Sequence, residues 1–238
     1  MARFVKQIIY GIFFVAVGGL VVAAISGAFS AKALPACTND CRPAGPTIAE
    51  VGEPLVMKTA NDSFLAVLVE VRNSSTDYGV ANLHYTIGLN DQTGRTLATL
   101  SQADDVLPGE DKYLLAVSND GTIIPDVASA SFNVGMPNWQ SALAFPLQPV
   151  SLTAGPTVTV GSSSITVAGT VRNGGSGAVA GLKALVVVFD KYQDPLFAGE
   201  TVVSVPPFGE TGFSVDLPAN LQNLSLFDPG RTRVYLYQ

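Results

Sequence analysis

The single histidine, His84, is the side chain in this sequence best suited to acid-base chemistry at neutral pH. A Ser-His-Asp hydrolase would have to use His84 as its general base, because the chain holds no second histidine. Its nucleophile would be expected in a G-x-S-x-G turn that opens a helix, and the sequence offers no such turn. His84 lies in the strand-like stretch LHYTI. We therefore interpret it as a polar strand position and predict no catalytic residue.

The densest group of carboxylates is Asp104-Asp105 followed by Glu110-Asp111. A calcium site needs six or more oxygen ligands at defined spacing. These carboxylates instead bracket the turn Leu107-Pro108-Gly109-Glu110. We expect a solvated, charged sheet edge and predict no metal ligand.

A glycine-rich loop, Gly174–Gly177, is the next feature that could bind a ligand. A phosphate-binding loop needs a helix N-terminus directly after it, because that is where free N–H groups point at the anion. Strand-like sequence lies on both sides of this loop. We expect a turn there, and the sequence predicts no cofactor.

The only two cysteines, Cys37 and Cys41, lie in the segment ALPACTNDCRPAGP. Two thiols without further cysteine or histidine nearby cannot complete a tetrahedral zinc site. In an oxidising compartment, a disulfide closing this small loop is the natural interpretation. The three prolines of the segment indicate a linker, which we place at residues 30–46.

Residues 8–29 carry no charge, and a helix of that length spans roughly 33 Å, enough to cross a hydrocarbon core. Arg3 and Lys6 precede this run and no acidic residue does. The positive-inside rule then places residues 1–7 in the cytoplasm and the C-terminal domains outside it. The sequence predicts a single-pass, membrane-anchored protein.

Other treatments of this N-terminal segment stay open. Ala31-Lys32-Ala33 is an A-x-A pattern at which signal peptidase could cut after Ala33. Leu34-Pro35-Ala36-Cys37 loosely resembles a lipoprotein processing site, with lipidation at Cys37. Retention, cleavage and lipidation all place the bulk of the chain outside the cytoplasm.

The rest of the chain is acidic and rich in residues that favour strands. Three of the 13 basic residues precede Ala33 and all 19 acidic residues follow it, so the charge from Ala33 onward is 10 − 19 = −9. Such a surface argues against nucleic acid as a partner, because phosphates require clustered lysine and arginine. Abundant Val, Thr and Ser, together with Gly and Pro at turns, indicate an all-β protein.

Alternating apolar residues outline two β domains. Leu65, Val67 and Val69 alternate with neighbours of a second face, and Ile165 and Val167 do so later. We place the first domain at 47–135, the joint at 136–147 and the second domain at 148–238. The joint holds the only tryptophan, Trp139, which we expect to pack between the domains or against one core.

The two domains are copies of one unit at an offset of about 100 residues. We expect the valines to face inward, the arginines to face solvent, the asparagines and aspartates to close strands, and the glycines to supply positive φ in type II turns. The repeat-defining residues are Val71, Arg72, Asn73, Asp91, Gly109 and Glu110 in the first copy, and Val171, Arg172, Asn173, Asp190, Gly209 and Glu210 in the second.

The repeated unit resembles the FxLYD-type domain. The naming motif falls on Val186, Val188, Phe189 and Asp190 in the second copy, and the same positions of the first copy are Ile87, Leu89, Asn90 and Asp91. The second copy matches more closely because it keeps the aromatic residue before the aspartate. The resemblance implies two tandem immunoglobulin-like β-sandwiches of the kind found in exported and membrane-tethered prokaryotic proteins. It supplies no catalytic residue.

Together these features predict a non-catalytic module of the cell envelope that binds or spaces protein partners. The alternative is a module that binds glycans or another small extracellular ligand. Its contact residues would be the aromatic side chains Trp139, Tyr192, Phe197 and Phe208.

Overall fold

The structure is a computed structural model that describes residues 46–238, and these residues form one compact unit. They are built from antiparallel strands joined by turns and four short 3₁₀ turns. No helix among them is long and apolar enough to cross a membrane. The predicted membrane segment 8–29, most of the linker, and the candidate disulfide Cys37–Cys41 lie outside the described residues.

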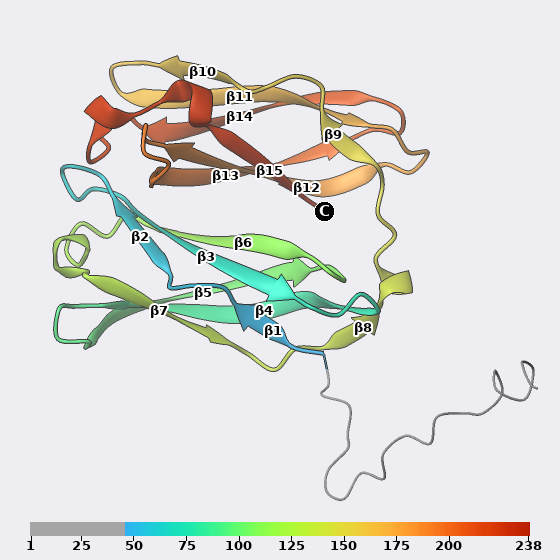
Figure 1. The fold of residues 1–238 in the computed structure, drawn as a ribbon, viewed down its shortest axis with the longest axis horizontal. Helices are drawn as coiled ribbons and strands as arrows, with labels where there is room; N and C mark the ends of the chain where they lie inside the picture. The colour runs from blue at the N-terminus through green and yellow to red at the C-terminus, as the bar shows by residue number, and fades with distance from the viewer. Residues whose placement is uncertain (1–45) are drawn as a thin grey trace, which may run out of the picture. The chain divides into compact units, whose positions relative to one another are not determined.

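The N-terminal half consists of two sheets packed face to face, which we call sandwich 1 (Figure 1). In one sheet β3 lies at the centre, with β1, β2 and β6 paired to it; in the other β4 pairs with β5, β7 and β8. The strands are β1 (Ile48–Glu50), β2 (Leu55–Lys58), β3 (Leu65–Asn73), β4 (Tyr78–Asn90), β5 (Thr96–Val106), β6 (Asp111–Ser118), β7 (Ser129–Val134) and β8 (Trp139–Ser141).

The C-terminal half, sandwich 2, repeats this arrangement. One sheet centres on β11, paired with β9, β10 and β14, and the other has the order β13-β12-β15. The strands are β9 (Val150–Leu152), β10 (Thr157–Val160), β11 (Ser164–Asn173), β12 (Val179–Phe189), β13 (Pro195–Val205), β14 (Glu210–Pro218) and β15 (Arg233–Tyr237). The predicted all-β class is confirmed, and both copies share one strand pairing scheme apart from β8, which has no counterpart in sandwich 2.

The core of each sandwich follows the alternation of its central strands. In β3 the inward residues Leu65, Val67 and Val69 are at most 1% exposed, and they pack against Ile87 and Leu89 of β4. Branched apolar side chains suit this position because they pack well against neighbours on a pleated sheet.

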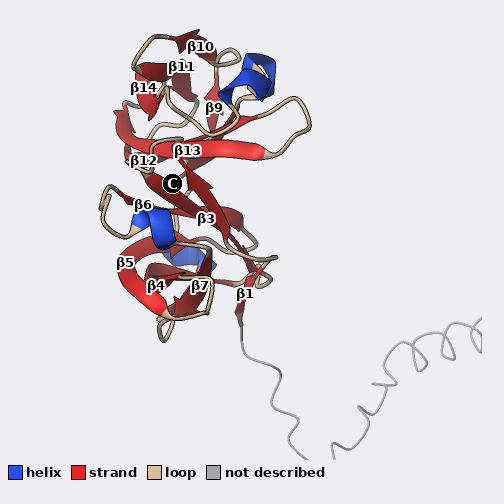
Figure 2. Cartoon of the chain, turned by 90° about the vertical axis from the view of Figure 1, so that its left-hand side faces the viewer, coloured by secondary structure: helices blue, strands red, loops and turns tan. Residues whose placement is uncertain are grey.

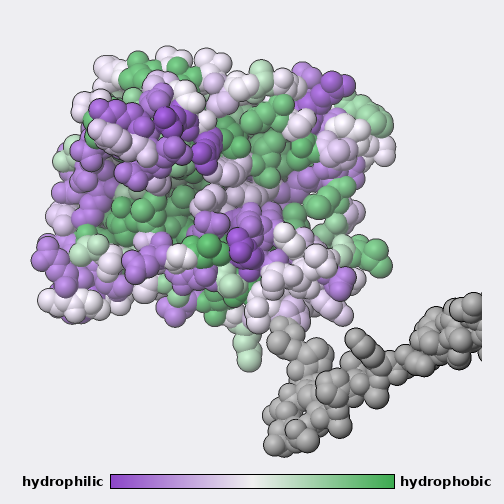
Figure 3. Space-filling model, in the orientation of Figure 1, coloured by the Kyte–Doolittle hydropathy of each residue, from purple (hydrophilic) through white to green (hydrophobic). Residues whose placement is uncertain are grey.

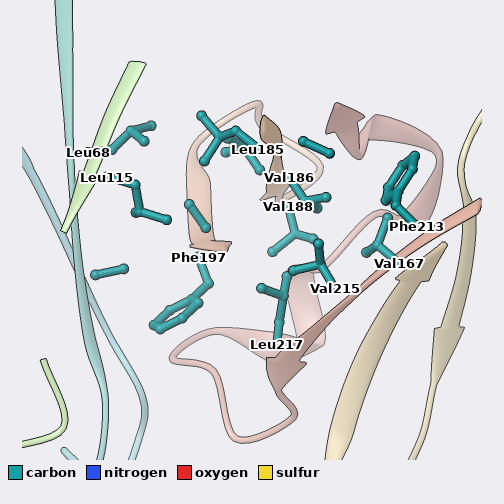
Figure 4. Close-up of a cluster of buried hydrophobic side chains, with 14 of the residues drawn as sticks. Leu68, Leu115, Val167, Leu185, Val186, Val188, Phe197, Phe213, Val215 and Leu217 are labelled. Atoms are coloured by element: carbon teal, nitrogen blue, oxygen red, sulfur yellow. The ribbon is translucent and has the colours of Figure 1, made fainter. Parts of the chain in front are cut away.

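The two sandwiches also pack on each other, so the four sheets lie in layers (Figures 1 and 2). Leu68 and Leu115 point outward from sandwich 1 and join the apolar cluster of sandwich 2, toward Leu185 and Phe197 (Figure 4). Met57 and Ala66 belong to the same cluster. The two halves are therefore held by continuous apolar packing.

The two copies differ on the outer face of one strand, which is covered by the other sandwich in β12 and not in β4. On β12 the outward residues Leu185 and Val187 are buried by sandwich 1. Val186 of β12 and Ile87 of β4 occupy the same inward position in their sandwiches. The residues of β4 that correspond to Leu185 and Val187 are therefore Thr86 and Gly88. The apolar residues Leu185 and Val187 thus lie on an outer face that the other sandwich removes from water.

The joint is shorter than the sequence predicts. Strand β8 pairs with the start of β4, with Trp139 opposite Val80, so the first sandwich extends to Ser141. Trp139 is half-buried and packs on the core of sandwich 1, one of the two expected positions. The ring of Phe145 fills the space that a side chain at Gly79 would occupy, which holds the connection against β4.

Candidate functional site

His84 projects from the outer face of β4, and its ring Nε2 lies 3.2 Å from the side-chain amide nitrogen of Asn82. This contact lies on the exposed surface and joins two neighbouring residues of the same strand. Within residues 46–238, no three or more His, Cys, Asp or Glu side chains are grouped closely enough to hold a metal ion.

The four carboxylates of the acidic cluster have separate partners. Asp105 accepts from the backbone N–H of Asn82 at 2.7 Å, and Glu110 accepts from that of Leu107 at 2.8 Å. Asp111 pairs with Arg72 at 2.7 Å on the exposed surface.

Asp104 contradicts the expectation of a solvated edge, because its side chain is only 9% exposed. The Nζ of Lys112 lies 2.8 Å from one carboxylate oxygen, and the Nζ of Lys183 lies 2.5 Å from the other. Lys183 also lies 3.5 Å from Glu200. These four residues, which we call the junction ion cluster, connect β5 and β6 of sandwich 1 to β12 and β13 of sandwich 2.

Lys112 is the most deeply buried member of this cluster, at 1% side-chain exposure. Its ammonium donates to Asp104 and to the backbone carbonyl of Asp105, and it lies 4.9 Å from the centre of the Tyr237 ring. The phenol oxygen of Tyr237 accepts from the N–H of Tyr113 at 3.0 Å. Tyr237 of β15 therefore covers the ammonium of Lys112 and contacts the backbone of sandwich 1.

Burial governs the titration of the groups around this cluster. Desolvation raises the pKa of the Glu200 carboxyl above its usual value, although Lys183 opposes the shift. Desolvation also works against charge on Lys183, but the hydrogen bond and the charge of Asp104 outweigh it, so the pKa of Lys183 is raised. Burial likewise raises the pKa of Tyr237.

The sequence held one signal of this cluster. Lys112 lies on the inward face of β6, the face that also carries Leu114 and Ala116, where an apolar residue is expected. A lysine at such a position must find a buried counter-charge. The identity of that partner depends on how β5 passes beside β6, which strand periodicity does not determine.

The repeated asparagines have the structural role expected of them. Asn73 is 1% exposed, and its amide donates at 2.8 Å to the carbonyls of Tyr78 and Leu107. Asn173 is fully buried and donates to Gly177 and Pro206. Each asparagine thus ties the end of a central strand to two loops of its own sandwich.

The repeated aspartates close the hairpins after β4 and β12. One carboxylate oxygen of Asp91 accepts from the N–H groups of Thr93 and Arg95, at 2.8 and 3.0 Å. Asp190 accepts from Tyr192 and Asp194 at 2.7 and 2.9 Å. Both are turn formers, as predicted.

Of the remaining repeat-defining residues, the valines and arginines lie where they are expected, and the glycine and glutamate pairs do not match. Val71 and Val171 are fully buried, and Arg72 and Arg172 are exposed, as expected. The predicted match of Gly109 and Glu110 with Gly209 and Glu210 is wrong by one residue. The N–H of Asn73 donates to Glu110, whereas that of Asn173 donates to Gly209.

The turn before β14 therefore has Phe208 at the position of Gly109. Gly109 has φ +68°, as predicted, and Phe208 has φ +50°, while Gly209 is not in the positive-φ region. Glu210 begins β14 opposite Arg172, just as Asp111 begins β6 opposite Arg72. The one-residue shift also places Phe213 inside its sandwich, whereas Tyr113 faces outward.

The glycine-rich loop Gly174–Gly177 connects β11 to β12, as expected, and no helix follows it. Asn173 accepts from the N–H of Gly175 at 2.8 Å, and Gln148 accepts from that of Gly177 at 3.3 Å. The side chain of Gln148 leaves no space for a Cβ at Gly175. These glycines therefore let the connection between the sandwiches lie against the loop.

The four aromatic residues do not form one contact surface. Phe197 is 3% exposed and belongs to the core of sandwich 2, so the expectation of an exposed ring is wrong. Tyr192 and Phe208 are 66% and 69% exposed but lie at opposite ends of β13, a strand of 11 residues or roughly 36 Å. Trp139 packs on sandwich 1.

A groove of about 650 Å³ lies between the sandwiches, beside the free edges of β6 and β14. Its apolar lining includes Phe64, Val117 and Leu217, and its polar rim includes Gln102 and Asp216. Val117 is 46% exposed there. Two carboxylates line this groove, Glu200 of the junction ion cluster and Asp216 of β14.

No protein-family model matches the chain, and no curated protein matches it. A solved structure, that of red sea bream transglutaminase, aligns with 73% of this chain and 27% of its own length. The identity is 14% and the TM-score 0.26, values too low to carry an argument about fold or function.

Proposed function

We propose that this chain is a non-catalytic, single-pass protein of the cell envelope, whose two sandwiches form a rigid module that binds and spaces protein partners outside the cytoplasm. The observation that carries the proposal is the joining of the sandwiches by one apolar cluster and one buried ion cluster. Two domains fixed in this way keep a constant distance between their ends, which suits a spacer or a platform.

The membrane anchor is residues 8–29, with residues 1–7 in the cytoplasm. We further propose that each sandwich is an immunoglobulin-like domain of the FxLYD type. The repeated strand order and the Asp190 hairpin support this assignment. The side chains of Asn73, Asn173 and Asp91 form hydrogen bonds with backbone groups at strand ends. These bonds also support a structural role for the repeated residues rather than a catalytic one.

Topology is tested first. The full chain expressed with its N-terminus intact should float with membranes and resist extraction by alkaline carbonate. Protease added to intact spheroplasts should digest the sandwiches, and protease added from the cytoplasmic side should not. Release of the chain into the soluble fraction, or protection of the sandwiches in spheroplasts, would contradict the anchored, extracytoplasmic arrangement.

Partner binding is tested in the same membranes. A photocrosslinking amino acid placed at exposed Gln92 or Tyr192 should yield discrete adducts with other envelope proteins that mass spectrometry identifies. A matched probe at the buried position Leu185 should yield adducts only within the chain. If the exposed probes also react only within the chain, the module is not a protein-binding platform.

A further inference from the structure

The molecule has two ends that differ sharply in composition. The near end consists of the loops 74–77, 107–110, 142–149, 174–178 and 206–209. The far end consists of the loops 59–64, 91–95, 119–128, 161–163, 190–194 and 219–232.

Hydrogen bonds establish that the near-end loops lie together. Ala142 donates to Asp77, which links the joint to the start of β4. Gln148 contacts the loop 174–177, and Phe208 donates through its N–H to Gly175 at 3.0 Å. The near end of sandwich 1 is thereby connected with that of sandwich 2.

The loop tips at the near end expose large apolar side chains. Leu143 is 93% exposed, Phe208 69%, Leu147 54%, and Tyr78, which begins β4 beside these loops, 46%. Figure 3 shows apolar surface at the right-hand end of the molecule, where β8 leads into β9. The far-end loops expose two such side chains, Phe64 at 41% and Tyr192 at 66%, so the near end presents more of them. Exposed apolar patches mark surfaces that contact a protein or a membrane.

Charge is distributed in the opposite sense. The charged residues in the near-end loops are Asp77 and Glu110, and Glu110 is half-buried and hydrogen bonded. The far-end loops carry Asp62, Asp91, Arg95, Asp120, Asp126, Asp190, Lys191, Asp194, Asp228 and Arg231. The near-end loops therefore carry fewer charges than the far-end loops, although the exposed pair Arg72–Asp111 flanks them at the ends of β3 and β6.

The described chain also begins at the near end. Ile48 of β1 pairs with Asn73, the last residue of β3, so Pro46 lies beside the near-end loops (Figure 1). Residues 30–45 separate it from the uncharged run 8–29 and can reach at most about 55 Å. The far end lies roughly 40 Å further along the strands of the sandwiches.

We propose that the near end rests on the membrane, with Leu143, Leu147 and Phe208 inserted at the headgroup level of a zwitterionic lipid surface. This inference rests on the proposed membrane anchor. A zwitterionic surface fits because Asp77 is exposed at this end, and no lysine lies in its loops to attract anionic lipid. Apolar and aromatic side chains at loop tips enter the headgroup region in this way. The charged far end then faces away from the bilayer.

Nitroxide labels on the full chain in phosphatidylcholine nanodiscs test this orientation. Cys37→Ser and Cys41→Ser provide a background without other thiols, into which Leu143→Cys, Phe208→Cys or the matched far-end control Tyr192→Cys is placed. Labels at 143 and 208 should collide several-fold more often with oxygen, relative to a water-soluble nickel chelate, than the label at 192. The native 66% exposure of Tyr192 makes it a fair control for the other two positions.

The outcomes separate this inference from the anchor. If the labelled chain does not float with the lipid at all, the anchor is wrong and the inference falls with it. If the chain floats and the labels at 143 and 208 are as accessible to nickel as that at 192, the anchor stands and the lipid contact is refuted. Equal shielding of all three labels would also refute it, because the contact would then not be confined to the near end.

Discussion

Lys183 of β12 lies 2.5 Å from the carboxylate of Asp104 of β5, and this ion pair crosses the junction between the two sandwiches. The second oxygen of Asp104 is held by Lys112, which is buried inside sandwich 1. Asp104 therefore neutralises one lysine from each half. A change at this single carboxylate affects the core of sandwich 1 and the junction together.

We expect Asp104→Asn to lower the free energy of unfolding by about 3 kcal/mol, because it leaves a buried ammonium without a counter-charge. Equilibrium unfolding in urea, followed by circular dichroism, measures the change. Asp111→Asn is the matched control: its pair with Arg72 is exposed and should contribute little. Equal stability of the two variants would show that Lys112 finds another counter-charge.

The junction should weaken in alkali. The folded pKa values of Lys183 and Tyr237 lie above their ordinary values of 10.5 and 10.0. Above about pH 10 the unfolded chain therefore releases protons that the folded chain retains, so the free energy of unfolding falls as pH rises. Urea titrations from pH 8 to pH 11 measure the slope.

Tyr237→Phe provides the control for this dependence. It removes the proton that Tyr237 retains, while Lys183 and the phenols of Tyr85 and Tyr113, whose pKa values burial also raises, keep theirs. The fall in stability above pH 10 should become shallower but not vanish. An unchanged slope would mean that the folded state does not favour the neutral phenol.

Apolar contact between the sandwiches should matter as much as the ion cluster. Leu185→Glu places a carboxylate in the continuous core and should destabilise the protein by about 3–5 kcal/mol, because the charge is buried without a partner. Thr86→Glu is the matched variant at the same position of the first copy, where the outer face is uncovered. It should be nearly neutral, and a similar loss in both variants would contradict the one-sided packing.

How far the sequence predicts this structure depends on the feature. The inward alternation of Leu65 and Val67, and the turn role of Asp91, follow from local patterns that each copy contains in full. The packing of the sandwiches is less accessible. Its signal is the unbroken apolar run around Leu185, which indicates a strand buried on both faces but does not name what covers it.

The wrong match of Gly209 with Gly109, in the turn before β14, also arises because the sequence does not show which residues pair. The repeated Gly-Glu pair predicts Gly209 at the position that requires positive φ, because glycine adopts that conformation most readily. Phe208 occupies it instead, and the preceding Pro206 accepts the turn hydrogen bond from Gly209 at 3.1 Å. The hydrogen bond made by Asn173 sets this register, and a comparison of residue types alone does not detect it.

The buried asparagines should be intolerant of change. Asn173→Ala leaves the carbonyls of Gly177 and Pro206 without their donor, which should cost about 2 kcal/mol. Asn173→Asp should cost at least as much, since a carboxylate cannot donate to either carbonyl. Arg172→Ala, one residue away and exposed, is the control and should change little. Thermal unfolding distinguishes the three, and a tolerated alanine at 173 would mean that water satisfies both loops.

Phe208 should be a position where the natural residue is less stable than glycine. Its φ of +50° is disfavoured for residues with a Cβ, and its exposed ring makes little contact that would compensate. Phe208→Gly should therefore raise the free energy of unfolding by about 0.5–1 kcal/mol, while Gly109→Ala, at the equivalent position of sandwich 1, should lower it.

In the membrane-bound chain the same Phe208→Gly change should reduce shielding of a label at residue 143. A gain in stability together with a loss of lipid contact would indicate that the phenylalanine is kept for the surface it presents, whereas a loss of stability would place its role within the turn.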